Sequence, residues 1–157
     1  MTPTDVKVRE MRWPDIDQTH RIEVRAFPQT AWSVETFWSE LAGVPATRHY
    51  VVAETSSNVV GYAGLMAVGA DADVQTLAVA PEFLRRGVGG RLLHALVDEA
   101  QRRACSRITL EVAATSEPAQ QLYLHHGFEV IARRSGYYGP GADALIMRRR
   151  LRLGSGS

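Results

Sequence analysis

The sequence contains little cysteine, no long hydrophobic run and almost no net charge. Its single cysteine, Cys105, cannot form a disulfide within the chain, which fits a reducing compartment such as the cytoplasm. A net charge of +1 at neutral pH argues against a surface that binds polyanions everywhere. Apolar stretches are short and flanked by charges, far below the roughly 20 residues of a membrane span. We therefore expect a cytoplasmic protein that binds neither a membrane nor nucleic acid directly.

The remaining composition is that of an ordinary globular protein. A chain of 157 residues is long enough to bury a substantial core within one domain. No charged and then apolar leader opens the chain, so we expect no secretory signal. The sequence ends in GSGS, which is typical of an added tail. We expect a single domain over residues 1–152 and a tail over 153–157.

Strand-like and helix-like patterns alternate along the chain. Period-two alternation predicts strands, and apolar residues spaced by three or four predict helices. The expected strands are 6–11, 49–55, 59–68, 71–81, 107–114, 128–138 and 144–151. The expected helices are 14–27, 33–42, 88–104 and 116–126, with Ser33 and Ser116 as amino-terminal caps. An early hairpin and a closing strand pair favour a mixed α/β sheet with helices on both faces. Short connections make 74–79 and 107–112 parallel neighbours.

The stretch LRRGVGGRLL, residues 84–93, places arginines and glycines at the beginning of a helix. Cations are disfavoured there because the amino end of a helix carries about half a positive charge. The same end binds phosphate through its N–H groups, and arginines become favourable beside a polyphosphate. The dinucleotide and Walker patterns both fail here, since Leu92 stands three residues after Gly89 and no Gly-Lys-Ser/Thr follows. A loop with solvated arginines is the alternative interpretation.

Longer segments resemble a known family. The sequence VQTLAVAPEFLRRGVGGRLLHALVDEA resembles the coenzyme A-binding core of the GNAT N-acetyltransferases, whose loop pattern is Gln/Arg-x-x-Gly-x-Gly/Ala. RAFPQTAWSVETF, LEVAATSEPAQQLYLHHGF and RRSGYYGPGADALIM are similar to the RimI subfamily, the ribosomal-protein alanine N-acetyltransferases. The resemblance extends from about Arg25 to Met147. It implies the GNAT fold: one mixed, mostly antiparallel sheet of six to seven strands, helices on both faces, and a parallel strand pair at the acetyl-CoA site.

The resemblance implies acetyl-CoA as the acetyl donor, without a metal. Leu77, Ala78 and Val79 would present strand backbone to the pantetheine arm, and the N–H of Val79 would stabilise the oxyanion. The pyrophosphate would be held by Arg85, Arg86, Gly87, Val88, Gly89 and Gly90.

The sequence departs from the family pattern in two places. Leu84 stands where the loop pattern has Gln or Arg, and we expect backbone amides to make this a small loss. Ala113 and Ser116 replace the Arg and Asn of the usual LEVRxSN. Ser116 would still contact the cofactor arm, with a shorter reach than Asn.

Two residues could perform the chemistry of acetyl transfer to an amine. Such transfer needs a base, because an α-amine has a pKa near 8 and a lysine amine a pKa near 10.4. In RITLEV the apolar residues point to one face and Glu111 points to the other. The resemblance implies Glu111 as the base and Tyr123 as the acid that protonates the departing thiolate. Without it, a solvated glutamate and a packing tyrosine are the ordinary interpretations.

The implied function is acetylation of the amino-terminal α-amine of a protein, with a ribosomal protein that begins with alanine as the acceptor. An acetyltransferase for lysine side chains or small amines is the alternative within the class. A non-catalytic acyl-CoA-binding module is the alternative from another class. Adjacent His125 and His126, and Asp71 with Asp73, lack the spacing or partners of a metal site.

Other residues have more limited interpretations. Trp13, Trp32 and Trp38 are expected to be packing residues, and Trp32 is also a candidate for the wall of the acceptor groove. The resemblance places the loop with Tyr137 and Tyr138 over the amino end of the acceptor peptide. The basic stretch RRRLR, residues 148–152, is expected to be the fringe of an edge strand.

Overall fold

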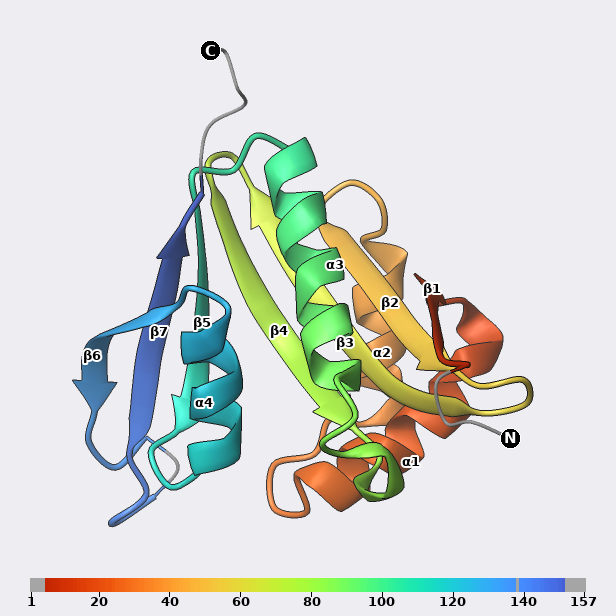
Figure 1. The fold of residues 1–157 in the computed structure, drawn as a ribbon, viewed down its shortest axis with the longest axis horizontal. Coiled ribbons are helices and arrows are strands. Elements are labelled where there is room, and N and C mark those ends of the chain that lie inside the picture. The colour runs from red at the N-terminus through yellow and green to blue at the C-terminus, as the bar shows by residue number, and fades with distance from the viewer. Residues whose placement is uncertain (1–4, 138, 152–157) are drawn as a thin grey trace. The chain divides into compact units, whose positions relative to one another are not determined.

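Figure 1 shows a computed structural model of the chain, in which residues 5–137 and 139–151 are described. The strands are β1 (Lys7–Glu10), β2 (Arg48–Glu54), β3 (Val59–Val68), β4 (Asp71–Val79), β5 (Arg107–Ala113), β6 (Glu129–Arg134) and β7 (Ala144–Arg150). The helices are α1 (Ile16–Ala26), α2 (Val34–Ala42), α3 (Val88–Arg102) and α4 (Glu117–His125). Two 3-10 turns, η1 (Trp13–Asp15) and η2 (Pro81–Phe83), precede α1 and α3. Each expected strand and helix is present; the boundaries of β3 are as expected, and at least one boundary of each of the others is shifted.

The strands form one seven-stranded sheet in the order β1-β2-β3-β4-β5-β7-β6. Strand pairs β1–β2, β2–β3, β5–β7 and β6–β7 are antiparallel. β4 and β5 are parallel, with Asp71–Asp73 opposite Arg107–Thr109. The mixed, mostly antiparallel sheet and its parallel pair are therefore confirmed.

The chain divides into two compact units, which we describe separately. Unit 1 comprises Met1–Met66 and Gln75–Glu99, and unit 2 comprises Ala67–Val74 and Ala100–Ser157. Both β4 and α3 contribute residues to each unit. A single domain over 1–152 stays a prediction, and the expected tail at 153–157 lies outside the described residues.

Helices cover both faces of the sheet of unit 1 (Figure 1). Adjacent residues of β3 point to opposite faces. Tyr62 faces α1 and α2, where its ring meets Phe37 edge-to-face at 5.8 Å between centroids. Gly61 faces α3, and a Cβ added to it would lie 3.0 Å from a methyl carbon of Leu92. The glycine therefore permits the close approach of α3 to the sheet.

A buried carboxylate connects three segments of unit 1. Glu23 of α1 is only 2% exposed. It accepts hydrogen bonds from the Tyr62 hydroxyl, from the Thr76 hydroxyl at 3.2 Å and from the Trp32 N–H at 3.1 Å. Burial, followed by the adjacent carboxylate, raises the pKa of Tyr62, so the phenol remains a donor. Three donors replace the hydrogen bonds that these carboxyl oxygens lose to water on burial.

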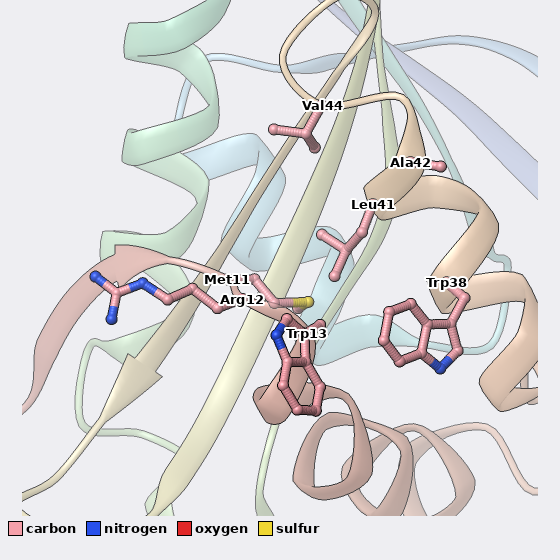
Figure 2. A pocket seen from close by; sticks show the side chains of 7 residues that line it. All are labelled: Met11, Arg12, Trp13, Trp38, Leu41, Ala42 and Val44. Carbon is pink, nitrogen blue, oxygen red and sulfur yellow. The ribbon is translucent and has the colours of Figure 1, made fainter.

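Two tryptophans of unit 1 are exposed, and Figure 2 shows them beside the pocket that they line. Trp13 is 66% exposed and Trp38 is 48% exposed, and their rings stack with centroids 6.1 Å apart. They line a pocket of about 410 Å³ together with Met11, Arg12, Leu41, Ala42 and Val44. Trp32, by contrast, packs against Phe37 with centroids 5.3 Å apart. The expected packing role therefore holds for Trp32, whereas Trp13 and Trp38 remain largely exposed.

In unit 2, α4 packs on one face of β5. Ile108, Leu110 and Val112 are buried on this face, as their alternation with polar residues predicts. The Gln120 side chain of α4 donates to the carbonyl oxygens of Ala113 and Ala114, at 3.1 and 2.9 Å. These hydrogen bonds hold α4 at the carboxyl end of β5.

The final strand lies inside the sheet rather than at its edge. β7 pairs with β5 on one side and with β6 on the other, so β6 is the terminal strand. The expectation that the basic stretch 148–152 fringes an edge strand is therefore wrong for residues 148–150. Arg150 lies opposite Arg107 in the antiparallel register of β5 and β7, and β6 occupies the edge outside β7.

Candidate active site

The glycine-rich loop joins β4 to α3 within unit 1. Arg85 and Gly87 adopt positive φ angles of 64° and 80°, a region that a glycine enters without steric cost. A Cβ at Gly87 would meet nothing within 4 Å, so the backbone is open there. α3 begins at Val88, which puts Gly89 in its first turn. N–H groups in a first turn have no acceptor within the helix and bind anions.

The arginines in this loop and at the beginning of α3 make two kinds of contact. The guanidinium of Arg86 lies over the ring of Phe83, 5.4 Å from its centroid, and Arg85 is exposed beside it. Arg91 instead donates to the carbonyl oxygen of Val6, which holds the segment before β1. The open backbone, the helix amino end and the exposed arginines together fit a pyrophosphate group.

The other expected cofactor residues lie at two strand ends. In β4 of unit 1, Ala78 is buried and Leu77 and Val79 are half-buried. In unit 2, Ser116 stands at the cap position before α4, but its side chain accepts no hydrogen bond from the helix. The predicted position of this cap is therefore confirmed and its capping hydrogen bond is not. Ser33, in contrast, accepts a hydrogen bond from the Thr36 N–H at 3.1 Å.

Glu111 is exposed on the face of β5 opposite the buried apolar residues of that strand, as their alternation predicts. Its carboxylate is accompanied by two groups from the following hairpin. The Nη1 atom of Arg134 lies 4.0 Å from the Glu111 Oε1 atom. The Tyr137 hydroxyl donates a hydrogen bond to the carboxylate, and this bond raises the pKa of Tyr137. Tyr138 lies outside the described residues.

A second carboxylate shares this face of unit 2. Asp73 of β4 lies opposite Thr109, and period two places Thr109 and Glu111 on one face. Burial raises the pKa of Asp73, and the charges of Asp71 and Glu111 raise it further. From the sequence, Asp71 and Asp73 were considered only as possible metal ligands. The register of β4 against β5, which brings Asp73 close to Glu111, cannot be derived from local sequence patterns. Asp71 forms an ion pair with Arg107.

Tyr123 is a buried residue of α4. It is 7% exposed, and its ring meets Phe128 edge-to-face at 5.9 Å between centroids. Its burial fits the packing interpretation and leaves its proposed role as an acid to experiment. Glu111 and Tyr123 both belong to unit 2.

Two other features are absent from the described residues: a cluster of metal-binding side chains and a helix that could span a membrane. Within residues 5–137 and 139–151, no three His, Cys, Asp or Glu side chains are grouped so that they could hold a metal ion. Over the same part of the chain, no helix has the length and apolar character that crossing a bilayer requires.

Comparisons with known proteins identify the family of this chain. The model of the acetyltransferase (GNAT) family matches residues 13–128. The [ribosomal protein bS18]-alanine N-acetyltransferase of Escherichia coli is 31% identical over 147 residues, which cover 89% of this chain and 94% of the relative. The N-alpha-acetyltransferase RimI of Mycobacterium tuberculosis is 37% identical over 123 residues, which cover 75% of each chain.

A solved structure shows the same fold over nearly the whole chain. The ribosomal-protein-S18-alanine N-acetyltransferase from Escherichia coli superimposes with a TM-score of 0.85 and 26% identity, covering 97% of both chains. The chain belongs to the GNAT acetyltransferase family, whose members use acetyl-CoA as the acetyl donor. Within that family it is similar to the RimI proteins that acetylate ribosomal protein bS18. It is therefore an acetyltransferase, which removes the non-catalytic binding module from consideration.

Proposed function

We propose that the protein transfers the acetyl group of acetyl-CoA to the amino-terminal α-amine of a protein, with a ribosomal protein that begins with alanine as the acceptor. The name of the Escherichia coli relative, which specifies an alanine of ribosomal protein bS18, supports this acceptor, and the name of the Mycobacterium tuberculosis relative supports an α-amine. The observation that carries the proposal is the Glu111 carboxylate, which lies on a face of β5 that α4 leaves open, beside a hairpin that bears Arg134 and Tyr137. A ribosomal acceptor also favours action in the cytoplasm, where ribosomes are assembled.

The proposed donor site comprises the loop and the end of β4. The loop from Arg85 to Gly90 would hold the pyrophosphate, and Leu77, Ala78 and Val79 would pair with the pantetheine arm. The N–H of Val79 would donate to the oxygen that becomes negative during attack. Ser116 would contact the same arm from the beginning of α4.

Glu111 acts as the base in this proposal. It accepts a proton from the acceptor ammonium, and the neutral amine then attacks the thioester carbonyl, so that a C–N bond forms as the C–S bond breaks. Tyr123 donates a proton to the departing thiolate and recovers one from the nitrogen of the new amide. At pH 7 about 10% of an α-amine with a pKa near 8 is neutral, against about 0.04% of a lysine amine. Deprotonation is therefore a smaller demand for an amino terminus.

The test compares Glu111→Gln with the unchanged protein on a peptide that begins with alanine. Thiol release gives kcat/KM between pH 6 and pH 9. We expect the largest deficit near pH 7 and a partial recovery toward pH 9, because the amine loses its proton without help there. Glu129→Gln, an exposed carboxylate of β6, is the matched control and should behave as the unchanged protein.

Two results would contradict parts of this proposal. A deficit of equal size at every pH would show that Glu111 orients the acceptor and does not accept its proton. A second peptide, with a blocked amino end and an internal lysine, tests the acceptor. Equal rates on the two peptides would establish lysine or small amines as the acceptors instead.

A further inference from the structure

The proposed base, Glu111, and two other side chains of unit 2, Arg134 and Tyr137, contact one another. Arg134 approaches the Glu111 carboxylate at 4.0 Å, and its guanidinium carbon lies 5.1 Å from the centroid of the Tyr137 ring. The Tyr137 hydroxyl completes the set through its hydrogen bond to Glu111. Each member therefore contacts the other two.

The strand register explains how Arg134 reaches across the sheet. Arg134 ends β6 and lies opposite Ala144 of β7, which in turn lies opposite Ala113 of β5. Glu111 lies two residues before Ala113, so all four residues share one face. Because Ala144 carries only a methyl group, the long Arg134 side chain can pass over β7 to β5. A larger residue at this position would stand in its way.

The hairpin that carries Tyr137 is held at its base. The Asp143 carboxylate accepts hydrogen bonds from the Gly136 N–H and from the Arg133 guanidinium, both at 2.8 Å. These bonds keep the pKa of Asp143 below its usual range. Tyr137 therefore has a defined position over Arg134.

Charges of both signs act on Glu111 on this face of unit 2. Asp73 repels the Glu111 carboxylate, and this repulsion contributes to the raised pKa of Asp73. Arg134 attracts the Glu111 carboxylate. The other charged side chains that the register places on this face are Asp71, Arg107, Glu129, Arg148 and Arg150. Asp71 and Arg107 pair with each other, which leaves Arg134 as the cation with a described contact to Glu111.

We infer that Arg134 is a positioning residue, which holds the Glu111 carboxylate directed toward the acceptor amine against the repulsion of Asp73. This inference rests on the proposed function of Glu111 as a base. Arg134 attracts the carboxylate from 4.0 Å, and a base that is held in one orientation needs less rearrangement before it accepts a proton. Arg134 itself does not exchange protons, because a guanidinium stays protonated throughout the working range.

The experiment measures kcat and KM for the alanine peptide with Arg134→Gln and Arg134→Lys. Loss of the cation should reduce kcat about three- to tenfold at pH 7, since the pair is partly exposed and screened. KM for the peptide should change little, because Arg134 acts on the base and does not contact the acceptor. Lysine should restore most of the activity, and the affinity for acetyl-CoA, measured by calorimetry, should not change.

The matched control is Arg150→Gln, which removes the same charge from the same unit. Arg150 lies four residues along β7 from Ile146, the residue opposite Glu111, a distance of about 13 Å at 3.3 Å per residue. This separation exceeds the screening length of about 8–10 Å, so kcat of this variant should match that of the unchanged protein.

A double variant separates this inference from the proposed function. If Arg134 acts through Glu111, Arg134→Gln should have no further effect in a Glu111→Gln background. Equal losses in both backgrounds, a deficit confined to KM, or failure of lysine to restore activity would overturn the role of Arg134. If Glu111→Gln alone leaves the rate unchanged, the proposed base is wrong, and that result is distinct from an unchanged Arg134→Gln.

Discussion

Removal of the buried Glu23 carboxylate should strongly destabilise unit 1. Glu23→Ala would leave the Tyr62 hydroxyl, the Thr76 hydroxyl and the Trp32 N–H without their described acceptor. A buried donor without a partner costs about 1–3 kcal/mol, and removing one side of a buried charged network costs about 3–5 kcal/mol. Water that enters the space left behind would recover part of this loss. We therefore expect a decrease of about 3–5 kcal/mol in the free energy of unfolding.

The isosteric variant Glu23→Gln should cost less. Its carbonyl oxygen can still accept a hydrogen bond, but its NH₂ group is a donor and would face at least one of the three donors. We expect a loss of about 1–3 kcal/mol for this variant. A larger effect of alanine than of glutamine would indicate that the carboxylate contributes through both its volume and its acceptor atoms.

Urea unfolding followed by tryptophan fluorescence measures both changes. Trp13, Trp32 and Trp38 all belong to unit 1, so the signal reports the unit that contains Glu23. With a urea dependence of about 2 kcal/mol per molar, the alanine variant should unfold at a midpoint about 1.5–2.5 M lower. Glu10→Ala removes an exposed carboxylate of β1 and should change stability by less than about 0.5 kcal/mol. A loss below about 1 kcal/mol for Glu23→Ala, at an unchanged slope, would refute the reasoning.

Four further predictions concern single positions. Tyr123→Phe should lower turnover by roughly 10²–10⁴ with unchanged acetyl-CoA affinity if it is the acid; turnover within a few-fold of the unchanged protein would favour the packing role. Gly89→Glu should abolish acetyl-CoA binding in calorimetry, because it puts an anion at a helix amino end that would hold phosphate; unchanged affinity in a folded variant would contradict that site. Gly64→Ala should destabilise the protein by about 1–3 kcal/mol in urea unfolding, since its Cβ would lie 2.1 Å from a ring carbon of Tyr50. Asp73→Asn should raise thermal stability at pH 7, because burial raises the pKa of Asp73 and disfavours its charged form in the folded state. The gain should disappear below about pH 4, where Asp73 is protonated in both the folded and the unfolded chain.

Local patterns in the sequence determined the elements and their order. Apolar residues spaced by three or four predicted a helix over 88–104, and those on one side of α3, Val88, Leu92, Leu96 and Ala100, are all buried. Ser33 predicted the beginning of α2, and the alternation in β5 predicted the face on which Glu111 lies. These features depend on neighbours a few residues apart, whose spacing directly reflects the helical and strand periods. The family resemblance then identified the loop and the candidate catalytic pair.

Only the tertiary structure decided which distant residues meet. Glu23 collects donors from a loop and from two strands, and no local period links those positions. Arg134 reaches Glu111 because the hairpin returns outside β7 and Ala144 leaves room between them. The exposure of Trp13 likewise follows from how η1 and α2 lie in unit 1, since an aromatic side chain carries no local signal of which surface will cover it. Pairings between remote segments depend on register and packing across the whole sheet, which the short-range spacing of residues does not encode.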